Sequence, residues 1–134
     1  MNKYTILLWC WLGLALLPSL LYSQDNIRSL QQVQLLSQDE CVVVQVNADW
    51  NFSANIDLSK LKNCFVFNAS IDNPAFGAAI KDEWNIKSVP TIIMFEYGKE
   101  IQRFEAGLSF KLDKDTILKK INDKIDEIQL RKFQ

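Results

Sequence analysis

Three short runs of almost entirely apolar residues lie in the middle of the chain: residues 41–46 (CVVVQV), 64–71 (CFVFNASI) and 91–95 (TIIMF). Runs of this length are typical of strands that are buried on both faces, as in a parallel sheet with helices on either side. The residues between the second and third runs include a helix candidate over 74–84, and a hairpin turn at 97–99 leads into a strand over 100–105. This order predicts a single α/β domain whose central mixed sheet is flanked by helices.

Two further helices are expected near the ends of this domain. Ser29 can cap a short helix that runs through Leu36. Near the C-terminus, isoleucines at 117, 121, 125 and 128 form one stripe on a helix, for which Asp113 or Asp115 would be the cap. Residues 51–63 form a polar connector with a brief helical pattern over 57–62.

The first 24 residues contain a single charge, at Lys3, and residues 4–22 form an uncharged and mostly apolar run. This pattern predicts a secretory signal peptide over residues 1–23, cleaved after Ser23, with a domain over 24–134. The alternative is an uncleaved membrane anchor over residues 4–22, which are just long enough to cross a bilayer. Either interpretation predicts export to the periplasm or secretion, with membrane contact only through this segment.

Composition excludes several classes of function. The 134 residues include no histidine, which removes Ser-His and Cys-His catalysis and every His-ligated metal site. With 15 basic and 16 acidic residues the net charge is -1, which gives no support for a nucleic-acid partner. The four glycines are too scattered for a phosphate-binding loop, and the acidic residues show no metal-ligand spacing. We expect no cofactor and no metal.

Two stretches carry a resemblance to a known family. Residues 41–50 (CVVVQVNADW) resemble the strand that leads into the active site of thioredoxin-like proteins, and "ADW" is similar to the periplasmic thiol–disulfide interchange branch. Residues 84–98 (WNIKSVPTIIMFEYG) resemble the second signature of the family, and Gly107 falls where the family has a glycine after its last strand. The resemblance covers about residues 26–130. It implies a thioredoxin-like fold in which Pro90 is cis and faces the active-site loop.

The chain departs from this family where the redox motif Trp-Cys-x-x-Cys is expected. The stretch reads Trp50-Asn51-Phe52-Ser53-Ala54, so Asn51 and Ala54 occupy the two cysteine positions. Disulfide exchange needs a thiolate to attack and a second thiol to resolve the mixed disulfide, and neither an amide nor a methyl group can do so. The buried Asp and Lys of the family become Gln45 and Asn68, and the helix after the loop is shortened. These changes predict a domain that is redox-inactive at the family site.

Cys41 and Cys64 begin the first and second predicted strands. The resemblance places Gln45 beside Asn68 on adjacent parallel strands. Cys41 and Cys64 each lie four residues earlier on their strands, so they are expected to lie opposite each other. Because four is an even number, both then lie on the same face of the sheet as Gln45 and Asn68. In an oxidising compartment such a pair is expected to form a disulfide. Two alternatives stay open: buried free thiols, and a redox pair relocated to the end of the sheet opposite the family's active site.

Three functional hypotheses follow. The first is a non-enzymatic protein-binding or chaperone-like module of the cell envelope, which would hold an extended peptide segment in a shallow groove implied at Trp50, Val89, Pro90 and Gly107. The alternative is a thiol–disulfide oxidoreductase, of thioredoxin type, that uses Cys41 and Cys64. A third possibility is an accessory domain kept for its surface.

Overall fold

The computed structural model describes residues 25–133, which form a five-stranded sheet in the order β1-β3-β2-β4-β5. The predicted cleavage site and apolar segment lie outside these residues. Among residues 25–133, no helix has the length and apolar character needed to cross a membrane. The elements in chain order are β1 (Asp25–Asn26), α2 (Leu30–Leu36), β2 (Cys41–Asn47), the 3-10 helix η2 (Asp49–Ala54), β3 (Cys64–Ser70), α3 (Gly77–Glu83), β4 (Thr91–Glu96), β5 (Lys99–Glu105) and α4 (Lys114–Lys132).

The sheet is mixed, as the sequence predicts. Strands β1, β3 and β2 are parallel, whereas β4 is antiparallel to β2 and forms a hairpin with β5. The predicted register between the first two long strands is confirmed, because Gln45 pairs with Asn68 and Cys41 pairs with Cys64. Strands β2 and β4 are buried along their whole length, which explains why their sequences lack polar alternation.

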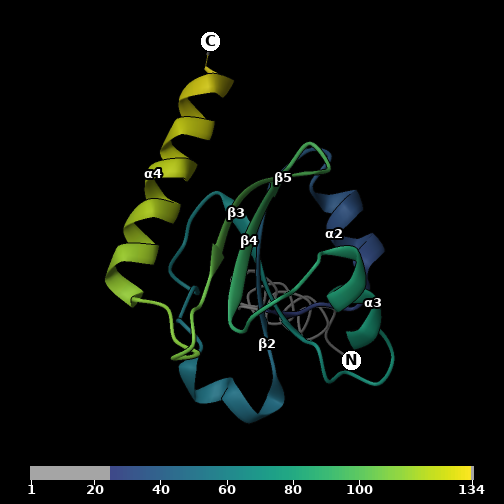
Figure 1. Ribbon diagram of the computed structural model, residues 1–134. Coiled ribbons are helices and arrows are strands. Elements are labelled where there is room, and N and C mark those ends of the chain that lie inside the picture. The colour runs from purple at the N-terminus through teal and green to yellow at the C-terminus, as the bar shows by residue number, and fades with distance from the viewer. Residues whose placement is uncertain (1–24, 134) are drawn as a thin grey trace, which may run out of the picture.

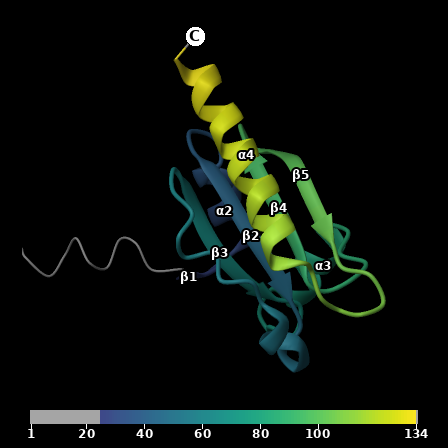
Figure 2. The same ribbon diagram turned by 90° about the vertical axis from the view of Figure 1, so that its left-hand side faces the viewer.

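Helices cover both faces of the sheet, with α4 on one side and α2 and α3 on the other (Figure 1). Alternate residues of β2 divide between the two cores: Val42 and Val44 pack toward α2 and α3, whereas Cys41 and Val43 pack against the isoleucine stripe of α4. When the molecule is turned so that α4 faces the viewer, α4 runs along the sheet in front of β2 and β4 (Figure 2). The C-terminal turn of α4 therefore lies at the end of the sheet where β2 begins.

Two local predictions differ from the structure. The connector pattern at 57–62 is not a helix, because the Asp57 carboxylate accepts hydrogen bonds from the backbone N–H and the hydroxyl of Ser59 and forms a turn instead. The helical residues lie earlier, in η2. The two-residue strand β1 was not predicted, because so short a strand has no periodicity to detect.

Helix α4 begins at the predicted cap Asp113, whose side chain offers a test of pH dependence. Its carboxylate accepts hydrogen bonds from the hydroxyl and the backbone N–H of Thr116, and these bonds hold the pKa of Asp113 below its ordinary value of 3.8. Because the pKa of Asp113 is lower in the folded than in the unfolded protein, the ionised carboxylate stabilises the fold above about pH 4. This contribution is lost as the pH falls through the pKa of Asp113 in the folded protein.

We expect Asp113→Ala to lower the melting temperature at pH 7, and we expect the difference from wild type to narrow below pH 4. Asp113→Asn is the matched control, because an amide oxygen still caps the helix but does not titrate. Circular dichroism melts from pH 2.5 to 7 would measure both effects. Equal melting temperatures for Asp113→Ala and wild type at pH 7 would contradict the assigned cap.

Candidate functional site

The two cysteines of the described region lie side by side where β2 and β3 begin. Their sulfur atoms form a disulfide with an S–S distance of 2.00 Å, and their Cα atoms are 4.6 Å apart. The two residues differ in exposure, since Cys41 is only 1% exposed whereas Cys64 is half-buried. The structure thus holds a bridge rather than two free thiols, and Cys64 is the less buried of its two residues.

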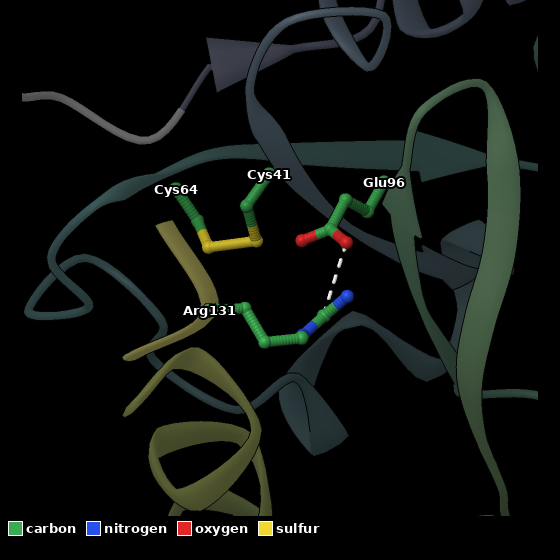
Figure 3. The surroundings of a disulfide bond; sticks show 4 residues. All are labelled: Cys41, Cys64, Glu96 and Arg131. Atoms are coloured by element: carbon green, nitrogen blue, oxygen red, sulfur yellow. Dashed lines mark hydrogen bonds and ion pairs between the residues drawn. A yellow bond between two sulfur atoms is a disulfide. The ribbon is translucent and has the colours of Figure 1, made fainter. Parts of the chain in front are cut away.

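A buried carboxylate lies on the other side of Cys41. The antiparallel register pairs Val42 with Phe95, so the next residue of β4, Glu96, lies opposite Cys41. The Glu96 side chain is 7% exposed and accepts a hydrogen bond from the guanidinium of Arg131 over 3.0 Å. Figure 3 shows the carboxylate and the guanidinium beside the disulfide, with Arg131 coming from the last turn of α4.

A groove of about 880 Å³ opens next to Cys64. It is lined by Glu40 and residues 59–65, which are the end of the connector and the start of β3. Leu61 and the exposed ring of Phe65 give it apolar surface, and Lys60 and Lys62 add positive charge. The positive φ of 68° at Asn63 turns the chain into β3, and it thereby sets the wall of the groove beside the cysteine.

The loop that matches the family's redox motif lies at the opposite end of β2, in η2. It contains no thiol, and its Asn51 is held as a structural residue: the amide nitrogen donates to Asn47 Oδ1 and to the Phe110 carbonyl. Gln45 plays a similar part, since its amide makes two hydrogen bonds with the backbone of Ile56. The changed positions therefore hold the connector and the loop around Phe110 in place.

The four residues of the predicted binding groove also lie at this opposite end. The Val89–Pro90 peptide bond is cis, as the resemblance implies, and the Pro90 carbonyl accepts a hydrogen bond from Ala106, next to Gly107. Trp50 is 66% exposed and stacks edge-on against Phe110, with ring centroids 5.2 Å apart. Val89 and Pro90 are buried, so of these side chains only the ring of Trp50 is broadly accessible.

No protein-family model matches the chain, and no curated protein matches it. Solved structures are similar in fold. A thioredoxin from Malassezia sympodialis has a TM-score of 0.61 and 18% identity, and the match covers 77% of this chain and 91% of that one. Thioredoxin O1 from Arabidopsis thaliana in its oxidised state has a TM-score of 0.56 and 18% identity, covering 76% and 97%. The chain has a thioredoxin-like fold.

The hypothesis of a redox-inactive, chaperone-like binding module is wrong. That hypothesis rests on the missing thiols of η2. The structure instead has the cysteine pair at the other end of the sheet bridged, within a thioredoxin-like fold.

Sequence reasoning missed Glu96, Arg131 and the groove. The available signal for Glu96 was its position directly after the apolar run TIIMF. Nothing in the sequence links it to Arg131, which lies 35 residues later. Within residues 25–133, no group of three or more His, Cys, Asp or Glu residues could hold a metal ion.

Proposed function

We propose that this protein is a thiol–disulfide oxidoreductase whose redox pair is Cys41 and Cys64. The observation that carries the proposal is the asymmetry of the bridge: the Cys64 side opens on a groove, whereas the Cys41 side is buried under α4. Exchange needs one accessible sulfur that meets the substrate and a second thiol that resolves the mixed disulfide. Cys64, which lines the groove, would meet the substrate, and the buried Cys41 would resolve the mixed disulfide.

The chemistry follows from this asymmetry. In the reduced protein the Cys64 thiolate attacks a substrate disulfide, forms a mixed disulfide and releases one substrate thiolate. Cys41 then attacks the Cys64 sulfur, which closes the Cys41–Cys64 bond and releases the second substrate thiolate. Two electrons pass from the cysteines to the substrate, and the reverse sequence oxidises a substrate dithiol.

The groove supports a polypeptide as the substrate. A volume of about 880 Å³ with Leu61 and Phe65 on its wall can take several side chains that flank a cysteine. Lys60 and Lys62 line the same groove, and positive charge near a sulfur favours its thiolate. Both features lie on the Cys64 side of the bridge, where attack must occur.

The test is reduction of insulin by dithiothreitol in the presence of the full chain. We expect wild type to accelerate precipitation of the insulin B chain several-fold over dithiothreitol alone, and we expect the double variant Cys41→Ala, Cys64→Ala to give no acceleration. Thiol counting before and after the reaction shows whether the bridge was opened. Absence of acceleration by wild type, with Cys41 and Cys64 still bridged at the end, would overturn the proposal and leave a structural disulfide.

A further inference from the structure

We propose that Glu96 is the proton acceptor for the Cys41 thiol when that thiol resolves the mixed disulfide, an inference that rests on the proposed function. The residues involved come from four elements at one end of the sheet. Cys64 begins β3, Cys41 begins β2, Glu96 ends β4 and Arg131 lies in the last turn of α4. Figure 3 shows their side chains gathered on the face that α4 covers.

The register places the carboxylate next to the sulfur that must lose a proton. Side chains directly opposite each other on antiparallel strands have Cβ atoms about 5 Å apart, and Glu96 stands in this relation to Cys41. Both side chains point to the same face, because Cys41 belongs to the same core as Met94, two residues before Glu96 on β4. Cys41 thus lies between its disulfide partner on one strand and a carboxylate on the other.

The burial of Cys41 is the reason why it needs a partner for its proton. A thiol is a weak nucleophile until it is deprotonated, and burial among apolar side chains disfavours the thiolate. Cys41 is 1% exposed and packs with Val43, Met94 and the isoleucines of α4, so bulk water has little access to its sulfur. A carboxylate within reach supplies the base that this site would otherwise lack.

Arg131 keeps the base in place. Its guanidinium donates to Glu96 Oε1 over 3.0 Å, which fixes one carboxylate oxygen and leaves the second to face the sulfur. In the resolving step the Cys41 S–H proton moves to Glu96, the sulfur attacks Cys64, and the bond between Cys64 and the substrate breaks. The departing substrate thiolate, or water, then takes the proton from Glu96.

The remaining charges around the carboxylate are more exposed. Lys99 on β5 pairs with Glu96 across the hairpin, and Glu40 precedes β2 on the groove side. On α4, the Lys124–Glu127 ion pair lies one to two turns before Arg131. Lys99 and Glu40 are exposed to solvent, which weakens their effect on the Cys41 sulfur.

The experiment uses the reduced full chain carrying Cys10→Ser, so that Cys41 and Cys64 are its two thiols. The probe is the aryl disulfide dithiobis(nitrobenzoate), which then releases its coloured thiolate in two steps. The first release reports attack by Cys64, and the second reports attack by Cys41 on the mixed disulfide. The second release does not depend on probe concentration. Cys41→Ser, which retains only the first release, identifies the two phases.

We expect Glu96→Gln to leave the first phase within about threefold of wild type and to slow the second by about 100-fold or more. The wild-type second phase should change little between pH 6 and 8, because the proton is passed within the protein. In Glu96→Gln it should rise about tenfold per pH unit, since only the ionised thiol then reacts. Glu127→Gln removes an equal charge from the exposed side of α4, away from the groove, and should leave both phases within about threefold.

Arg131→Met distinguishes the role of Glu96 as a proton acceptor from its role in the ion pair that helps to hold α4 in place. It removes the ion pair but keeps the carboxylate, so its second phase should keep the flat pH profile. Equal slowing by Arg131→Met and Glu96→Gln, or a Glu96→Gln second phase as fast and as flat as wild type, would overturn the inference. Absence of the first phase in wild type would instead contradict the proposed function, so the two failures are distinguishable.

Discussion

Replacing Cys41 with serine is expected to trap a covalent complex between the reduced protein and its substrate. Cys64 keeps its place on the groove and still attacks a disulfide, but the serine hydroxyl cannot displace the substrate from the mixed disulfide. With Cys10 also replaced by serine, we expect close to one adduct per chain with insulin or an aryl disulfide. The adduct should be stable in the absence of other thiols and released by dithiothreitol. Intact mass spectrometry measures the adduct directly.

Cys64→Ser is the matched variant, because it leaves the buried cysteine as the single thiol of the described region. Cys41 is 1% exposed in the bridged protein, so we expect its modification under native conditions to be at least ten times slower than that of Cys64 in Cys41→Ser. Equal capture by the two variants would contradict the assignment of Cys64 as the attacked sulfur. Failure of both to react while folded would identify an inert structural bridge.

The strands and helices follow from short-range patterns in the sequence, whereas the pairing of Cys41 with Cys64 also needs the strand register that the family resemblance implies. Strands β2 and β4 are apolar runs bounded by turn residues, and the isoleucine spacing of α4 has a helical period. Once two parallel strands are in register, the alternation of their side chains places Cys41 and Cys64 on one face.

The groove and the ion pair could not be predicted in this way. Glu96 and Arg131 meet only because α4 crosses the sheet in one direction and ends over the start of β2, a packing outcome without a local signal. The groove depends on the turn at Asp57 and on the left-handed backbone of Asn63, which replace the expected helix. Side-chain hydrogen bonds overrode the helical pattern there, and they created the surface beside Cys64.

The functional error has a related cause. The resemblance directed attention to η2, where Asn51 replaces a thiol, because a family motif fixes where chemistry is expected. The cysteine pair lies at the other end of the sheet, far from that motif. A buried carboxylate, a guanidinium and a groove become visible at that end only in three dimensions.

Replacing Ile121 with alanine is expected to give a large loss of stability, because this side chain fixes α4 to the sheet. Ile121 is 0% exposed and packs in the core that also contains Cys41, Val43 and Met94. Truncation removes buried surface and leaves a cavity, which costs about 2–5 kcal/mol in the free energy of unfolding. Urea unfolding of the oxidised protein, with an unchanged m-value, measures the loss.

Leu130→Ala is the control on the same helix, since Leu130 is 67% exposed and its truncation should change stability by about 0.5 kcal/mol or less. A loss below about 1 kcal/mol for Ile121→Ala would contradict the tight packing of α4. The site depends on that packing, because α4 is the element that carries Arg131 to Glu96. If Ile121→Ala loosens α4, the Arg131–Glu96 contact should weaken with it, whereas Leu130→Ala should leave both the contact and the resolving step unchanged.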